Sequence, residues 1–523
     1  MAAGPGDPEL VTVRAATLLG SAEVVVADCG TEIIAAVHAG TAAQIVRAVD
    51  DAGAPLDHAA RVRLVVEAAR AGHEVVRLLA GDPVLDGSLA LEAAGLHKAR
   101  VPFEVAPGVS TVTGVAAYAG FTLTGGRSRE VHVIEMGSGD VAWAKHVDPT
   151  TTLVVVDGAD RVADVASGLL QAGRAPGTPL TVTTGGTTVD QRTVATTLGD
   201  AGAALKAAKP AAGTAPGAAV VVIGDVVSAR DKLSWFETKP LFGWRVLVPR
   251  TREQAGALSA QLLRHGAVPV EVPTISVEPP RTAQQMERAV HGLVSGRYEW
   301  IAFTSVNAVR AVRERFDEYG LDARSFAGLK VAAVGEQTAA ALRAFGVHPD
   351  LVPSGEQSSA GLLEDWPDFD PVLDPINRVF LPRADIATET LVAGLTERGW
   401  EVDDVTAYRT VRAAPPAAAT REAIKTGGFD AVLFTSSSTV RNLVGIAGKP
   451  HASTVVACIG PATAKTAEEH GLRVDVLAET PSVAALTEAL ATHGESLRLA
   501  AAEAGERNWR PSRRRTTSRR KAT

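Results

Sequence analysis

Short apolar runs, each followed by a glycine-containing or polar turn and then a helical pattern, recur along the whole chain. The runs are unbroken rather than alternating, and many are rich in β-branched residues. Unbroken runs of this kind predict strands buried on both faces, as in the largely parallel sheets of α/β domains. We therefore predict an α/β fold throughout. The clearest runs are Val24–Val26, Val75–Val76, Leu153–Val156, Val220–Ile223, Val246–Val248 and Val432–Phe434.

Three strand–turn–helix blocks occur twice, in the same order, after a Pro- and Gly-containing boundary at Lys239–Gly243. Arg245–Arg250 recurs as Arg378–Arg383, Ile301–Arg310 as Val432–Arg441, and Val331–Ala339 as Val455–Ala464. The offsets are 133 residues from Arg250 to Arg383, 131 from Thr304 to Thr435, and 125 from Gly335 to Gly460. Near-equal offsets predict that residues 240–490 form two similar α/β domains with a cleft between them.

Length and composition set the broad class. With 523 residues the chain exceeds a typical domain of ~100–200 residues, so several domains are expected. No run of about 18 apolar residues occurs, and no basic region followed by an apolar run opens the chain. We expect neither a spanning helix nor a secretory leader, and hence a cytoplasmic protein. Cys29 and Cys458 are the only cysteines, which excludes a disulfide framework and a cysteine-based zinc site. No metal site is predicted.

Charge is distributed unevenly. The chain carries a formal net charge of −7, whereas residues 505–523 hold eight basic side chains and one acid. Clustered arginine suits phosphate, so a nucleic-acid contact is conceivable. The low apolar content favours a disordered, solubilising tail over residues 495–523, and we expect no nucleic-acid partner.

The strand ends of the repeated blocks carry the candidate binding residues. Carboxyl ends of strands are where open α/β sheets bind ligands, and helix N-termini attract carboxylates and phosphates. The same residues are also ordinary helix caps, worth ~1 kcal/mol each, and the arginines suit rim salt bridges as well as carboxylate forks. Several such ends on one cleft favour a polyanion ligand. The candidates are Arg250, Thr304, Ser305, Asn307, Gly335, Thr338, Arg383, Thr435, Ser436, Ser437, Gly460 and Thr463.

Residues 240–490 show no nucleophile–base constellation, Walker motif, HExxH motif or telling carboxylate pair. This half is therefore expected to position a polyanion, with little covalent chemistry by side chains. A two-domain ligand-binding protein without catalysis is the alternative from another class.

Residues 244–490 resemble uroporphyrinogen-III synthase. The motifs that carry the resemblance are Val246–Arg250, Phe303–Val309, Ala333–Thr338, Ala407–Thr410 and Ile459–Thr463. The family implies two flavodoxin-like domains joined by two crossing strands, domain one being residues 244–277 plus 411–490 and domain two residues 278–406. It also implies that the first domain combines block one with the late copies of blocks two and three. Its substrate is linear hydroxymethylbilane, an octacarboxylate that is cyclised without a cofactor, with inversion of the last pyrrole ring.

Tyr408 is the side chain most suited to catalysis in this half. The resemblance places it in the second connection between the domains, where its phenol can donate a proton or hydrogen bond to the departing hydroxyl. The alternative is a hinge aromatic that only packs between the domains.

Residues 1–235 carry a different set of glycine-rich turns, any one of which could be only a tight turn. In order they resemble the tetrapyrrole methyltransferases, in particular uroporphyrinogen-III C-methyltransferase. The family implies two α/β domains that bind S-adenosylmethionine, and usually a homodimer. Asp28 matches a family acid near the substrate, and the resemblance makes it the catalytic candidate of this half. The implied cofactor-binding residues are Gly4, Gly6, Asp7, Gly81, Asp82, Pro83, Ser110, Thr111 and Thr187.

This half departs from the family pattern at several places. Met1 stands almost inside the first glycine loop, so the start is expected to be truncated or misassigned, with the family's first strand missing. Cys29–Thr31, Ile33–Asp51 and Asp86–Ala90 replace family segments that carry basic residues. We therefore predict an active synthase fused to a methyltransferase-like half that binds S-adenosylmethionine but methylates poorly. The alternative is a fully bifunctional enzyme that makes precorrin-2.

Overall fold

The computed structural model describes residues 1–136, 140–156, 158–202, 218–250, 252–506 and 509–513. By backbone contacts the chain divides into two compact units. One comprises residues 1–246, 259–269 and 487–523, and the other comprises residues 247–258 and 270–486. Residues 203–217 and most of the Arg-rich end of the tail fall outside the described residues.

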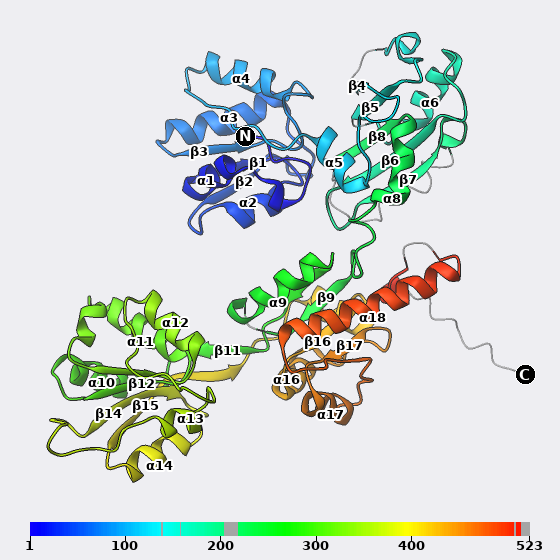
Figure 1. The fold of residues 1–523 in the computed structure, drawn as a ribbon. Coiled ribbons are helices and arrows are strands. Elements are labelled where there is room, and N and C mark those ends of the chain that lie inside the picture. Colours follow the sequence, from blue (N-terminus) through cyan, green and yellow to red (C-terminus); the bar gives the residue numbers. More distant parts are fainter. Residues whose placement is uncertain (137–139, 157, 203–217, 251, 507–508, 514–523) are drawn as a thin grey trace, which may run out of the picture. The chain divides into compact units, whose positions relative to one another are not determined.

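The first sheet of the N-terminal half is parallel, as predicted, with the order β2-β1-β3. Val25 and Ala27 of β1 pack with α1 and α2, whereas Val24 and Val26 pack with α3 and α4, so helices cover both faces (Figure 1). The strands are β1 Val24–Ala27, β2 Gln44–Arg47 and β3 Val75–Leu78, and the helices are α1 Val13–Ser21, α2 Glu32–His38, α3 His58–Arg70 and α4 Ser88–Lys98.

Residues 1–4 extend the carboxyl end of this sheet. The Ala3 N–H donates to the Leu79 carbonyl at 2.8 Å, and the Ala2 N–H donates to the Ala106 carbonyl at 3.1 Å. The backbone that follows β3 is therefore paired with the first residues of the chain at Leu79.

The second sheet of this half has the order β4-β5-β8-β6-β7 and is mostly antiparallel, so the prediction of parallel strands is wrong here. Only β4 and β5 run parallel. The runs in β5 and β8 are unbroken because α5 and α6 cover opposite faces of the sheet. The elements are β4 Glu130–Glu135, β5 Thr151–Val156, β6 Pro179–Gly186, β7 Arg192–Thr197, β8 Ala218–Ile223, α5 Thr111–Ala119, α6 Val162–Gln171 and α8 Arg230–Leu233.

The repeated blocks build two further five-stranded sheets by exchanging their copies. One sheet, β10-β9-β16-β17-β18, joins the first copy of block one to the late copies of blocks two and three, as the resemblance implies. Its strands are β9 Arg245–Val248, β10 Val268–Glu271, β16 Ala431–Phe434, β17 Val455–Cys458 and β18 Val476–Leu477. Its helices are α9 Arg252–Arg264, α15 Ala418–Thr426, α16 Ser437–Ala447, α17 Pro461–Glu469 and α18 Val483–Glu503.

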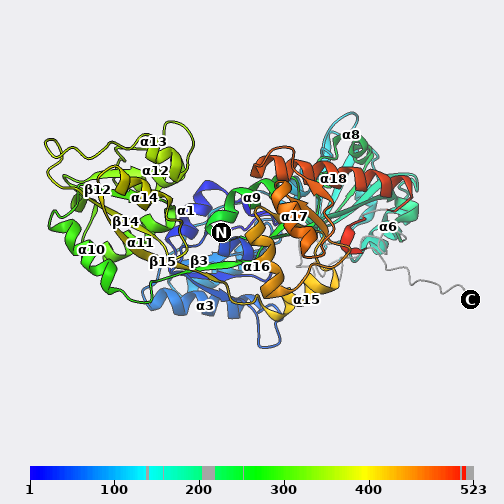
Figure 2. The same ribbon diagram turned by 90° about the horizontal axis from the view of Figure 1, so that it is seen from below.

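The other sheet has the order β11-β15-β14-β12-β13 and takes the remaining copies. Core residues of α10, α11 and α12 cover one face, and those of α13 and α14 form a separate cluster. Antiparallel β11 and the end of β15 run side by side (Figures 1 and 2). The elements are β11 Ile275–Glu278, β12 Trp300–Phe303, β13 Lys330–Ala333, β14 Arg378–Ala384, β15 Glu401–Arg412, α10 Gln284–Val294, α11 Val306–Glu318, α12 Glu336–Ala344, α13 Ser359–Glu364 and α14 Thr390–Glu397.

Helix α18 corrects one boundary. It continues to Glu503, so residues 495–503 are helical rather than part of a disordered tail. Among the described residues, no helix is long and apolar enough to cross a membrane.

Candidate functional site

The glycine turns of the N-terminal half lie against one another, although they are far apart in sequence. Gly4 and Gly81 form a backbone bridge. A Cβ built on Gly81 would lie 3.5 Å from Thr111 Oγ1, and one built on Gly6 would lie 3.4 Å from Thr187 Oγ1. The structure thus brings together all four segments that carry the predicted cofactor-binding residues.

Thr187 and Asp7 join two of these segments. The Asp7 N–H donates to Thr187 Oγ1 at 3.0 Å, and the Tyr118 hydroxyl donates to Asp7 Oδ2 at 2.8 Å. Thr187 has a φ of +63°, which is rare for a β-branched residue, and its N–H donates to Gln191 Oε1 at 2.8 Å. Strained backbone held by surrounding hydrogen bonds is typical of ligand-binding turns.

A pocket of about 230 Å³ lies at the Gly81–Pro83 turn. The pocket is lined by Met1, Ala2, Asp82, Pro83, Val84, Leu89, Val105, Ala106, Pro107 and Gly108. Its volume is below the ~300–1,000 Å³ of typical ligand pockets, so it suits one part of a cofactor-sized molecule.

The hydroxyl of Thr111 lies beside this turn and indicates what kind of ligand fits there. This hydroxyl is buried and has no hydrogen-bond partner in the part of the chain that the structure describes. Buried hydroxyls normally have a partner, and the neighbouring Gly81 leaves the approach free of a side chain. Thr111 and the glycine cradle therefore fit a polar ligand such as S-adenosylmethionine.

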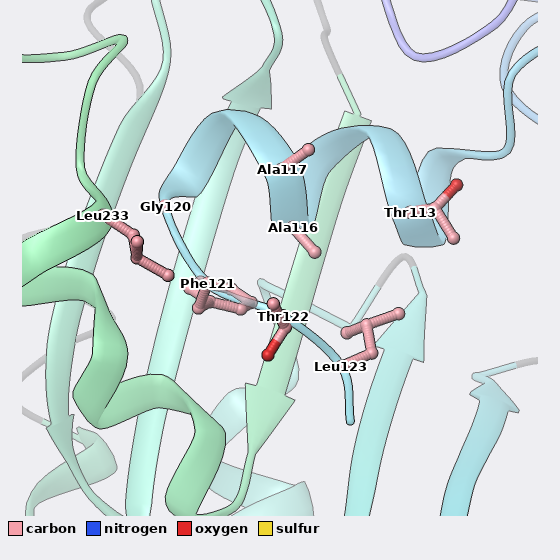
Figure 3. A pocket seen from close by; sticks show the side chains of 8 residues that line it. All are labelled: Thr113, Ala116, Ala117, Gly120, Phe121, Thr122, Leu123 and Leu233. Atoms are coloured by element: carbon pink, nitrogen blue, oxygen red, sulfur yellow. The ribbon is translucent and has the colours of Figure 1, made fainter. Parts of the chain in front are cut away.

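A larger, more open pocket of about 390 Å³ lies along α5 (Figure 3). Apart from Thr113 and Thr122, it is lined by apolar residues and Gly120, and it contains none of the predicted site residues. Without a charged group, this pocket is not suited to a polycarboxylate.

Asp28 is buried at the end of β1. Its Oδ1 accepts from Arg77 Nη2 at 2.6 Å, and its Oδ2 accepts from the Ala80 N–H at 3.1 Å. The carboxylate is thus engaged within the protein, and its predicted place near a substrate stays a prediction.

In the C-terminal half, the candidate turns are helix starts, as predicted. Ser305 caps α11, Ser436 caps α16, and Gly335 and Gly460 are the N-cap residues of α12 and α17. Thr304 and Thr435 precede the two serines, Asn307 lies in the first turn of α11, and Ser437 begins α16.

The two glycine turns differ in what covers them. A Cβ at Gly335 would lie 2.9 Å from Gln357 Oε1, which already accepts from the Glu336 N–H at 3.2 Å. At Gly460 the only atom within 4 Å of such a Cβ is Pro481 Cβ, at 4.0 Å. The start of α17 is therefore more open to a carboxylate than the start of α12. Thr338 and Thr463 are buried, each with 4 % exposure, which favours a packing role for both.

The two repeated arginines also differ. Arg383 is buried, and its guanidinium donates to Asp404, to Glu389 and to the Thr388 carbonyl, which favours the salt-bridge interpretation over a substrate contact. No ion pair of Arg250 is found within the described residues, and its Nε is buried without a hydrogen-bond partner there. Burial lowers the pKa of the Arg250 guanidinium. Burying a charged guanidinium costs free energy, and an anion bound beside Arg250 would offset that cost.

Tyr408 packs through its ring and makes a polar contact through its hydroxyl. Its ring is 7 % exposed and belongs to the hydrophobic cluster of α10–α12. Its hydroxyl lies 2.9 Å from Ser305 Oγ, at the carboxyl end of β12. The packed ring therefore fixes the phenol at the start of α11, among the predicted substrate-binding residues Thr304, Ser305 and Asn307.

Residues 256–488 match the sequence family described as uroporphyrinogen-III synthase HemD, and residues 2–202 match the tetrapyrrole (corrin/porphyrin) methylases. The porphyrin biosynthesis protein HemD of Ruminiclostridium josui is 31 % identical over 504 residues, which cover 93 % of this chain and 96 % of that protein. The chain belongs to the HemD family of porphyrin biosynthesis proteins. It is an enzyme of the uroporphyrinogen-III synthase family fused to a tetrapyrrole methyltransferase half.

Other relatives match somewhat less than half of this HemD-family chain. A siroheme synthase of Azotobacter vinelandii is 36 % identical over 241 residues, or 45 % of this chain and 51 % of that protein. The uroporphyrin-III C-methyltransferase of Thermus thermophilus, solved with S-adenosyl homocysteine, is 30 % identical and covers 44 % of this chain and 97 % of its own, with a TM-score of 0.36.

Sequence reasoning missed several partners in the HemD-family chain. The hydrogen bonds of Gln357, Tyr118 and Gln191 were not anticipated, nor was the ion pair of Arg77 with Glu92. Arg77 inside an apolar strand and Glu92 inside an apolar helix are the signals that could have revealed that last pair, because buried charges need partners.

Proposed function

We propose that the C-terminal half converts hydroxymethylbilane into uroporphyrinogen III. The observation that carries this proposal is the Tyr408–Ser305 contact, which places a phenol at the N-terminus of α11. Tyr408 gives a proton to the departing hydroxyl, which leaves as water. The last pyrrole ring then inverts through a spiro intermediate, and the macrocycle closes with loss of one pyrrole proton, which restores the phenol of Tyr408.

The substrate's carboxylates are held by Arg250 and by the N-termini of α11, α16 and α17. Each helix start offers N–H groups and a partial positive charge, worth ~0.3–1 kcal/mol per anion near the surface. Incubation of the full chain with hydroxymethylbilane tests the proposal. The inverted isomer must form faster than the uninverted isomer that spontaneous closure gives, and exclusive formation of the uninverted isomer would contradict it.

We also propose that the N-terminal half binds S-adenosylmethionine at the turns around Gly4, Gly81, Ser110 and Thr187. The match to tetrapyrrole methylases and the buried, unpartnered Thr111 hydroxyl support this. When bound, the cofactor would supply a methyl group. The chain's own residues would orient it, the Gly81–Pro83 turn through its backbone and Thr111 through its hydroxyl.

The matched arginines give the first prediction. Arg250→Gln is expected to raise the KM for hydroxymethylbilane about tenfold or more, since a charged hydrogen bond is worth ~1.5–3 kcal/mol. It should not lower the Tm, because no described ion pair is lost. Arg383→Gln should instead lower the Tm, because it leaves Asp404 without its partner. Steady-state kinetics and thermal unfolding of both variants check this. An unchanged KM for Arg250→Gln would show that Arg250 does not bind the substrate.

Chelation gives the second prediction. We expect prolonged treatment with EDTA to leave the rate of ring closure unchanged within experimental error, because no metal-ligand motif occurs in residues 240–490. Loss of inversion with an unaltered circular dichroism spectrum would show that the synthase half needs a metal.

We further propose that this enzyme works in the cytoplasm, as a homodimer formed through the methyltransferase-like half, on a soluble linear tetrapyrrole and without nucleic acid. Sedimentation of the full chain tests the dimer, and a monomer at micromolar concentration would contradict it.

A further inference from the structure

Five ionisable side chains from β1, β3, α3 and α4 gather beside the Gly81–Pro83 turn. Asp28, Arg77 and Glu92 are buried at 8 %, 8 % and 4 % exposure. Arg61 lies 3.6 Å from Asp28 and 3.7 Å from Glu92, and His58 Nδ1 lies 3.3 Å from Glu92 Oε1. Within the cluster, the charges of the two carboxylates and the two guanidinium groups balance.

Arg77 is the centre of this cluster. Its Nε and Nη2 donate to the two oxygens of Glu92 at 2.8 and 2.9 Å, and Nη2 also donates to Asp28 Oδ1 at 2.6 Å. Its Nη1 donates to the Leu78 and Val26 carbonyls at 2.8 and 3.3 Å. All five N–H groups of the guanidinium are thus used, which fixes its plane.

These bonds hold both ends of one loop. At the strand end, Asp28 Oδ2 accepts from the Ala80 N–H, and Arg77 bonds the Leu78 carbonyl. At the helix end, Glu92 lies in the second turn of α4. The Gly81–Pro83 turn lies between these two anchors, and Gly81 has a left-handed φ of +65°.

A buried charge network adds little net stability, because desolvation offsets much of the attraction between its charges. Apolar packing of the same volume often stabilises a fold equally well. What the network supplies is direction, since the planar guanidinium donates to its carboxylates in one plane. We propose that Asp28, Arg77 and Glu92 are positioning residues that hold the Gly81–Pro83 turn in the conformation that receives S-adenosylmethionine. This inference rests on the proposed cofactor binding by the N-terminal half. It assigns Asp28 to the support of the cofactor turn.

The test compares Glu92→Gln with a matched control, Arg174→Lys, in the full-length chain. Arg174 is also buried, at 3 % exposure, and bonds two backbone carbonyls, those of His146 and Thr151, beside the second sheet. Both variants are expected to lower the Tm. Only Glu92→Gln should weaken S-adenosylhomocysteine binding, by about tenfold or more in titration calorimetry, which corresponds to ~1.4 kcal/mol.

Hydrogen exchange separates this inference from the cofactor proposal. In the ligand-free protein, amides of residues 80–91 should exchange about tenfold faster in Glu92→Gln than in wild type, and should be unchanged in Arg174→Lys. If wild type does not bind S-adenosylhomocysteine, the cofactor proposal fails, and the exchange data still decide whether the network holds the turn.

Equal exchange and equal affinity in the two variants would overturn the inference and leave a merely stabilising ion pair. If Glu92→Gln does not fold, Asp28→Asn undergoes the same two measurements. This variant removes the carboxylate charge beside Arg77 while keeping an oxygen for the Ala80 N–H.

Discussion

Tyr408→Phe is expected to slow ring closure with inversion by about 10²–10⁴, the usual contribution of a positioned general acid. The substitution removes one hydroxyl and keeps the ring, which is buried in the cluster of α10–α12. The fold should therefore persist while the group facing Ser305 at 2.9 Å is lost. Single-turnover kinetics with hydroxymethylbilane, with the isomers of the product separated, measure the effect.

Tyr298→Phe is the matched control for this experiment. Tyr298 belongs to the same cluster, is 4 % exposed, and donates its hydroxyl to Asp403 Oδ2 at 2.6 Å on the same strand β15. It precedes β12 and so lies at the opposite end of that strand from Ser305. We expect Tyr298→Phe to lower the Tm at least as much as Tyr408→Phe does, and to leave the rate of ring closure unchanged. If Tyr408→Phe also keeps its rate within about a factor of two, far below the range for a general acid, Tyr408 is a packing residue.

The architecture of the C-terminal half could be predicted because each repeated block carries its own local signal. Val246–Val248 and Val432–Phe434 are unbroken apolar runs, and both become strands covered on their two faces. Ser305 and Ser436 each follow such a run and cap the next helix, as local cap chemistry requires. The exchange of copies between the two sheets came from the family resemblance, because local pattern does not encode which strands pair.

Strand direction in the second sheet could not be predicted from the same signal. Leu153–Val156 and Val220–Ile223 are as apolar as parallel strands because two helices bury them, yet they pair antiparallel. An unbroken run reports burial on two faces, and direction depends on connections that the run does not contain.

The segments that carry the candidate residues could be predicted from the sequence, whereas most of the side-chain contacts of these residues could not. Arg250 and Arg383 each follow a proline in the repeated blocks, but Arg250 lies beyond the end of β9 whereas Arg383 lies within β14, and their surroundings differ. Asp404, which pairs with Arg383, lies 21 residues away on the neighbouring strand. Gln357, which covers Gly335, likewise comes from a distant loop. Such partners are set by tertiary packing. The sequence alone therefore could not distinguish a substrate contact from a salt bridge for either arginine, whereas the structure shows that only Arg383 has carboxylate partners within the described residues.

The N-terminal half is expected to bind S-adenosylhomocysteine measurably, yet to methylate uroporphyrinogen III about 10³-fold less well than an enzyme with a full set of substrate cations. Each missing charged hydrogen bond costs ~1.5–3 kcal/mol, and two or three together reach that factor at ~1.4 kcal/mol per tenfold. Titration calorimetry measures the first quantity. Transfer of a labelled methyl group measures the second.

The segment Ile33–Asp51 offers few cations to a polycarboxylate substrate. Arg47 is the only lysine or arginine between Ile33 and Asp51, and its Nε already donates to Glu32 at 2.9 Å. Helix α2 instead exposes Ile33 and Val37, at 61 % and 59 %. An octacarboxylate gains nothing from these apolar side chains, whereas the glycine turns and Thr111 that suit the cofactor are in place.

Two glycine variants separate cofactor binding from general strain. Gly81 and Gly126 both have left-handed φ values, +65° and +58°, so alanine strains the backbone alike at each. A Cβ at Gly81 would face Thr111 Oγ1 at 3.5 Å, whereas one at Gly126 would meet nothing within 4 Å. Gly81→Ala should therefore lose S-adenosylhomocysteine binding, and Gly126→Ala should keep it.

If wild type instead converts hydroxymethylbilane and S-adenosylmethionine efficiently into the dimethylated product, the apolar face of α2 does not limit the substrate. Both halves then act in sequence, the second supplying the first.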